Sequence, residues 1–76
     1  QIKRESLSVR AFMSKILREL RERDDVAFED LFSPTATIAE VVVTFLALLE
    51  LAKELLVEIS QSHAFGMIHV RSIPPA

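Results

Sequence analysis

The sequence contains no cysteine, one glycine and two histidines, and each scarcity excludes a kind of chemistry. Without cysteine there is no disulfide, no thiolate metal site and no cysteine nucleophile. One glycine cannot form a glycine-rich phosphate loop, and no serine lies in a nucleophile-elbow pattern. His63 and His69 alone do not supply the four ligands that zinc usually takes. We therefore expect no cofactor, no metal and no enzymatic activity.

Long apolar runs are absent, and basic residues are scarce after residue 23. The longest uncharged apolar stretch, 41–49, lies between Glu40 and Glu50, and a membrane span needs about 20 predominantly apolar residues. Seven of the nine Lys and Arg residues lie in 1–23, whereas eight of the eleven Asp and Glu residues follow. The sequence predicts no membrane partner, and its acidic part is unlike a nucleic-acid reader.

The length of 76 residues predicts one domain with one core. Half of the residues are hydrophobic, and such an excess in a small domain indicates that some of them lie at an interface. Because the chain starts with Gln1 rather than Met, we expect a fragment of a longer protein. We predict the end of a linker at 1–7, with a frayed first helical turn as the alternative, a folded domain at 8–71 and a proline-rich tail at 72–76.

An amphipathic helix is predicted from a Ser8 N-cap to about Arg23. Apolar residues recur along it at i, i+3, i+4, i+7, i+8 and i+11, as expected for one buried face: Val9, Phe12, Met13, Ile16, Leu17 and Leu20. Basic and acidic residues cover the other face, where Lys15–Glu19 and Arg18–Glu22 have the spacing of i, i+4 ion pairs.

A second helix is predicted over roughly 38–54, with Thr37 and Glu40 as its capping box. Its expected core stripe consists of Ile38, Val41, Phe45, Leu48, Leu49 and Ala52. An adjoining face is also mostly apolar and consists of Ala39, Val42, Val43, Leu46, Ala47 and Glu50. A helix that is apolar most of the way round is either central in the domain or covered by a partner.

Shorter elements complete the pattern. Residues 26–28 can add an edge strand, and 29–32 predict one helical turn that ends before Pro34. Alternating residues at 56–60 and 67–71 predict a β-hairpin, in which His69 points outward if its neighbours face the core. The expected fold class is α+β, mostly α: a winged helix of three helices plus a C-terminal β-hairpin.

The long helix is a poor candidate for reading DNA. A recognition helix presents Arg, Lys, Asn or Gln to the major groove, whereas this one offers aliphatic residues and Glu50. The sequence therefore favours a protein-binding module. A DNA-binding winged-helix regulator is the alternative, and a third possibility is self-association through the apolar face. Weak DNA contact by the basic first helix stays open.

Residues 41–53 resemble the signature helix of the segregation and condensation protein A family, the bacterial kleisins. Residues 57–61 and 65–68 continue that pattern, and 26–32 match the family's segment between its first and third helices. The resemblance covers most of 8–71. The family often has a glycine after the long helix, where residues 53–56 of this chain contain none, and an acid where Met67 stands.

This resemblance implies the C-terminal winged-helix domain of a kleisin. Such a domain docks on the ATPase head of a structural maintenance of chromosomes (SMC) protein and helps to close a ring that holds DNA during chromosome condensation, segregation and cell division. Segregation and condensation protein B binds a middle region that this chain lacks, DNA is held only indirectly, and the location is the cytoplasm and nucleoid. Residues expected to contact the head are Val42, Val43, Leu46, Ala47, Glu50, Phe65 and Met67.

Overall fold

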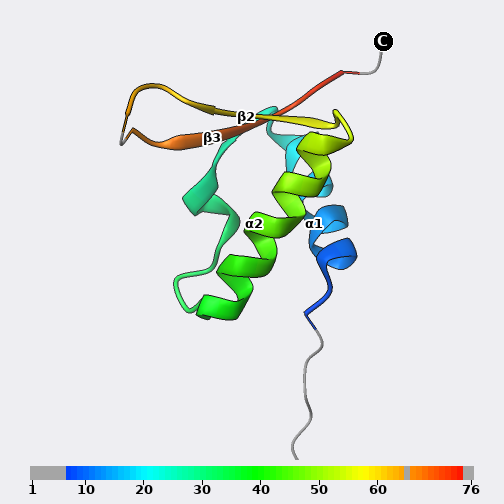
Figure 1. Cartoon of the computed structure of the whole chain (residues 1–76), viewed down its shortest axis with the longest axis vertical. Helices are drawn as coiled ribbons and strands as arrows, with labels where there is room; N and C mark the ends of the chain where they lie inside the picture. The colour runs from blue at the N-terminus through cyan, green and yellow to red at the C-terminus, as the bar shows by residue number, and fades with distance from the viewer. Residues whose placement is uncertain (1–6, 65, 75–76) are drawn as a thin grey trace, which may run out of the picture.

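The computed structural model describes residues 7–64 and 66–74, which fold as a small α+β domain (Figure 1). The chain runs through helix α1 (Val9–Glu22), strand β1 (Asp25–Ala27), 3-10 helix η1 (Phe28–Leu31), helix α2 (Ile38–Lys53) and strands β2 (Val57–Gln61) and β3 (Ile68–Ser72). This order confirms the predicted one. In Figure 1, the sheet lies across the C-terminal ends of both α-helices, which pack against each other.

The expected number of three helices is wrong, since the described residues contain two α-helices. The predicted helical turn is a single 3-10 turn instead. It ends at Phe32, whose backbone is extended and whose N–H donates to the Glu29 carbonyl at 3.4 Å. Pro34 follows two residues later and disfavours helical backbone at the residue before it, so the turn does not lengthen into an α-helix.

The start and the buried face of α1 confirm the sequence prediction. The Ser8 hydroxyl accepts a hydrogen bond from the Ala11 N–H at 3.3 Å, which satisfies one of the free donors at the helix N-terminus. Ile16 and Leu20 are buried in the core. The other four residues of the predicted apolar face pack against that core: Val9, Phe12, Met13 and Leu17.

The capping box at the start of α2 is also confirmed. Thr37 Oγ1 accepts from the Glu40 N–H at 3.1 Å, and Glu40 Oε1 accepts from the Thr37 N–H at 3.2 Å. Each residue thereby satisfies a backbone donor of the other. This pair fixes where α2 begins and therefore which turns of the helix meet the core.

Helix α2 ends in a Schellman motif that has leucine in place of the usual glycine. The Leu56 N–H donates to the Leu51 carbonyl at 2.9 Å, and the Leu55 N–H donates to the Ala52 carbonyl at 3.0 Å. Leu55 has a φ of 62°, the left-handed conformation that glycine adopts without steric cost. Within residues 53–56, where the resemblance implies a frequent glycine, Leu55 is the residue with this backbone.

Replacing Leu55 with glycine is expected to stabilise the domain. The left-handed conformation costs an L-residue roughly 1–2 kcal/mol, part of which the greater entropy of unfolded glycine offsets. Because Leu55 is 73% exposed, little packing is lost, so we expect the free energy of unfolding to rise by about 0.5–1 kcal/mol.

Urea denaturation measures the change, with Glu54→Gly as the matched control. Glu54 is the preceding residue and has a φ of −86°, so glycine gains nothing there and should lower stability. A Leu55→Gly variant that is less stable than wild type would contradict the assigned strain.

The sheet is antiparallel with strand order β1-β3-β2. Val26, Val70 and Ile59 are paired across the three strands, and the row lies over the core with Val26 and Val70 buried. The predicted hairpin is confirmed, with each strand placed one residue later. His69 lies on the outer face, as expected, with its Nδ1 2.9 Å from Asp25 Oδ1.

The core of α2 differs from the sequence prediction. Its buried residues are Thr44, Ala47, Leu48 and Leu51, of which the predicted core stripe contained only Leu48. Phe45, expected in the middle of the core, is 45% exposed, and Ala47, expected to face a partner, is fully buried at 0%. Both expectations are wrong, because the helix is turned about a quarter of a turn from the predicted orientation at 100° per residue.

Candidate uncovered apolar face on the long helix

Helix α2 presents an apolar face to solvent. Its exposed members recur at i, i+3, i+4, i+7, i+8 and i+11, and we name them together the α2 outer face: Ile38, Val41, Val42, Phe45, Leu46 and Leu49. Ile38 is 84% exposed, Val42 50% and Leu46 46%. Single exposed hydrophobic residues are ordinary on a protein surface, but six on one helix face form a contiguous patch of the kind that marks an interaction site.

This face lies on the side of α2 opposite the core. The four buried residues of the helix are centred about 180° from Val42 at 100° per residue. Helix α2 is therefore apolar on both sides, although the domain covers only one of them. A helix that is hydrophobic all round is normally buried, so the sequence of α2 suits a helix covered on both sides.

Two features explain why the helix packs through Thr44 and Ala47 rather than through Phe45. Thr44 donates its hydroxyl hydrogen to the Glu40 carbonyl at 2.8 Å, so its polar atom is satisfied within the helix and can be buried. Thr44 and Ala47 are also small, and small residues let another element approach closely. Phe45 and Leu46 are bulky and lie outside this contact.

Aromatic residues border the α2 outer face on the side of η1. The Phe45 ring meets the Phe28 ring edge-on at a centroid distance of 6.2 Å, and Phe28 meets Phe32 in the same manner at 4.8 Å. Charge lies at the ends of the helix: Glu40 is held in the capping box, and Lys53 Nζ lies 3.8 Å from Glu50 Oε2. The middle of the face is free of charge, as the centre of a protein interface usually is.

The structure divides the seven predicted contact residues. Val42 and Leu46 are exposed on the α2 outer face, whereas Val43 and Glu50 are half-buried at its border. Ala47 is buried in the core, as reported above, and cannot contact a partner without unfolding. Two residues belong to the β2–β3 connection: Met67 is 52% exposed, and Phe65 lies outside the described residues.

The sequence pattern had assigned four members of the α2 outer face to the core: Ile38, Val41, Phe45 and Leu49. An apolar period of 3.6 residues identifies an apolar helix face. When the opposite face is apolar too, the period does not show which of the two faces is buried. Thr44 is the residue that could have indicated which face of the helix is buried. A hydroxyl one helical turn after Glu40 can bond the backbone carbonyl, which makes threonine an acceptable buried residue there.

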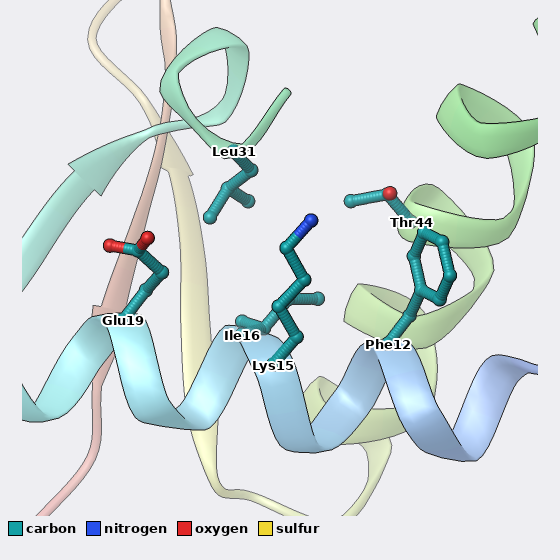
Figure 2. A pocket seen from close by; sticks show the side chains of 6 residues that line it. All are labelled: Phe12, Lys15, Ile16, Glu19, Leu31 and Thr44. Atoms are coloured by element: carbon teal, nitrogen blue, oxygen red, sulfur yellow. The ribbon is translucent and has the colours of Figure 1, made fainter. Parts of the chain in front are cut away.

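Neither the small cavity in the core nor a cluster of metal ligands offers another site in the described part of the chain. A cavity between α1, η1 and α2 is lined by Phe12, Lys15, Ile16, Glu19, Leu31 and Thr44 (Figure 2). Its volume of about 10 Å³ is close to the minimum for one water molecule, so it is not a ligand site. Residues 7–64 and 66–74 bring together no group of three or more His, Cys, Asp or Glu side chains suited to a metal ion.

In the same residues, neither α-helix has the length and apolar content that crossing a membrane requires.

Fold and surface together define a small α+β domain with one uncovered apolar helix face. The family model described as segregation and condensation protein ScpA matches residues 1–73. The chain therefore belongs to the segregation and condensation protein A family, which confirms the resemblance read from residues 41–53.

Individual relatives agree with this assignment. Segregation and condensation protein A of Xylella fastidiosa strain 9a5c is 44% identical over 72 residues, which cover 95% of this chain and 24% of that protein. The protein of the same name from Bacillus subtilis strain 168 is 41% identical over 70 residues, or 91% of this chain and 28% of that protein. The chain thus spans about a quarter of the length of these relatives.

Proposed function

We propose that this chain is the C-terminal winged-helix domain of a bacterial kleisin and docks on the ATPase head of an SMC protein. In this proposal, the domain comprises residues 8–71, with the end of a linker at 1–7 and a tail at 72–76. Of these flanking segments, residues 1–6 and 75–76 lie outside the described residues. The 3-10 helix η1 takes the place of the middle helix of the winged helix, and the β2–β3 hairpin is the wing.

The observation that carries the docking proposal is the α2 outer face. Membership of the segregation and condensation protein A family supports a role in chromosome segregation and condensation. The exposed side chains from Ile38 to Leu49 supply an apolar surface without charge at its centre. Burying one Val, Leu, Ile or Phe side chain fully contributes about 1.5–3 kcal/mol, so a few such residues can dominate the affinity.

The proposed contact set differs from the one expected from sequence. It centres on Val42, Phe45, Leu46 and Leu49, with Val43 and Glu50 at the border and Met67 contributing from the hairpin. Phe65 belongs to the proposed set by sequence alone, since it lies outside the described residues. Ala47 is excluded because the core covers it completely.

Further parts of the proposal concern the longer protein. We place the contact with segregation and condensation protein B in a middle region outside this chain and the contact with a second SMC subunit in an N-terminal region. The chain itself acts by binding, with ATP hydrolysis belonging to the SMC partner. The assembled ring would hold DNA in the cytoplasm at the nucleoid, so cells that lack the contact should fail in chromosome partition.

Co-purification tests the function. The chain, mixed with a purified SMC ATPase head from the same organism, is expected to elute with it as a stable complex in gel filtration. The same chain should show no sequence-selective, nanomolar binding to duplex DNA at physiological salt, since α2 presents aliphatic residues instead of base-reading ones. Failure to bind the head, together with selective DNA binding, would favour the transcriptional regulator instead.

A further inference from the structure

Helix α1 carries a stripe of basic side chains on its solvent side. Arg10, Ser14, Arg18 and Arg21 follow one another at i, i+4, i+8 and i+11 and are all exposed, and we call them the α1 basic stripe. At 100° per residue they fall within about 80° of one another, away from buried Ile16 and Leu20. At 1.5 Å per residue, the stripe extends along the helix for about 16 Å.

The arginines of this stripe form no close ion pair with the described carboxylates beside them, which are Glu50 and Glu54 near Arg10 and Glu19 and Glu22 near Arg18. Within the described part of the chain, no ion pair of 4.0 Å or less includes Arg10, Arg18 or Arg21. The expected pairs Lys15–Glu19 and Arg18–Glu22 are both wrong: neither is an ion pair of 4.0 Å or less, and Glu19 turns to Arg23 at 3.9 Å instead. Glu22 lies at the border of the stripe on the helical wheel.

Lys15 is occupied elsewhere. Its Nζ lies 5.7 Å from the centre of the Phe12 ring, a cation–π distance, so Lys15 belongs to the opposite border of the helix, beside the small cavity (Figure 2). Three guanidinium groups therefore remain as the free cations of the stripe.

We propose that the α1 basic stripe contacts the phosphate backbone of duplex DNA, without reading its sequence. Guanidinium groups bind phosphate oxygens through paired hydrogen bonds, and serine hydroxyls are common phosphate donors. B-DNA presents a phosphate charge about every 3.4 Å along each strand, so the stripe faces several of them over its length. Contact through arginine and serine alone fixes position on DNA without sequence specificity.

The composition of the stripe favours DNA over an acidic protein as the partner. Protein interfaces usually bury an apolar centre, as the α2 outer face does in the proposed docking. Between the arginines the stripe offers Ser14, and its neighbours on the helical wheel are Ala11 on one side and half-buried Leu17 on the other, so no large apolar side chain lies within the stripe. Because the stripe lies on α1 and the apolar face on α2, a head bound to α2 would leave the stripe free.

The number of free arginines sets the expected salt dependence. Three phosphate contacts predict a slope of about −3 in log K against log salt concentration, since each contact contributes about −0.9. The affinity should therefore fall by roughly 40-fold between 50 and 200 mM salt. A sequence-selective regulator would instead keep tight binding to one site at the higher salt.

Fluorescence anisotropy of the 76-residue chain with a labelled 30-base-pair duplex tests the proposal across this salt range. The stripe variant is Arg10→Gln/Arg18→Gln/Arg21→Gln. Its matched control is Arg23→Gln/Lys53→Gln/Arg71→Gln, which removes the same amount of charge from exposed positions off the stripe. Circular dichroism should show both variants folded, because all six side chains are exposed.

We expect the stripe variant to bind at least tenfold more weakly at 20 mM salt and to lose most of the slope. The control should stay within about threefold of wild type. An equal loss in both variants, or no binding by wild type at 20 mM salt, would overturn the proposal. Displacement of the duplex by polyglutamate at equal charge concentration would also overturn the assignment to DNA. Head binding by the stripe variant should be unchanged, so this test is independent of the docking proposal.

Discussion

Replacing Ala47 with glutamate is expected to remove much of the stability of the domain, whereas replacing its neighbour Leu46 with glutamate is expected to change the stability little. Ala47 is fully buried beside Leu48 and Leu51, and a carboxylate there would lack both water and a partner. An uncompensated buried charge costs on the order of 3–5 kcal/mol. A chain of 76 residues has a total stability of about 4–11 kcal/mol at 0.05–0.15 kcal/mol per residue.

Leu46 is the matched control because it is the adjacent residue and receives the same new charge. Its side chain is 46% exposed on the opposite side of α2, so the carboxylate stays in water. Circular dichroism and urea denaturation measure both variants. A folded Ala47→Glu variant of near wild-type stability would show that α2 is oriented differently from the structure described above.

The second large effect is expected at Leu51. Its side chain is completely buried, so Leu51→Ala removes apolar contacts and leaves a cavity, with an expected loss of about 2–5 kcal/mol in the free energy of unfolding. Phe45→Ala should cost less, about 1–2 kcal/mol, because the residue is 45% exposed and its described aromatic contact is Phe28.

Thermal or urea unfolding of these two variants decides between the orientations of α2. The sequence pattern alone placed Phe45 at the centre of the core, which would give Phe45→Ala the larger loss. A result in which Phe45→Ala is more destabilising than Leu51→Ala would support that orientation. The order of the two losses is informative even if both magnitudes differ from the estimates.

Helix α1 and the hairpin were predictable from sequence because each has one apolar face. The residues from Val9 to Leu20 repeat with the helical period, and charged residues occupy the rest of the helix, so only one orientation buries the apolar side. The strands alternate, and buried Val57 and Val70 fix which face meets the core. Ser8 and the Thr37–Glu40 pair marked both helix starts.

The orientation of α2 was not predictable in the same way. With apolar residues around most of its circumference, several orientations bury similar amounts of apolar side chain. The choice depends on packing: Thr44 and Ala47 are small, and Thr44 satisfies its own hydroxyl at the Glu40 carbonyl. The predicted contact set contained the same error: Ile38, Val41, Phe45 and Leu49 were placed in the core although they are exposed, and Ala47 was placed at the surface although it is buried.

The ion pairs of α1 were also not predictable from sequence spacing. Glu19 has basic residues both four positions before it and four positions after it, so spacing alone allows two partners. In the structure it turns to Arg23, and Lys15 lies over the Phe12 ring. Exposed pairs of this kind differ little in energy, so sequence spacing does not choose between them.

The affinity of Leu46→Glu for the SMC head tests the α2 outer face most directly. Isothermal titration should give a measurable affinity for the wild-type chain and a loss of at least a hundredfold for the folded variant, because docking would bury an unpaired carboxylate in an apolar interface. Glu58→Lys on the outer face of the sheet is the control and should bind like wild type. A folded Leu46→Glu variant that binds the head as tightly as wild type would show that another surface docks.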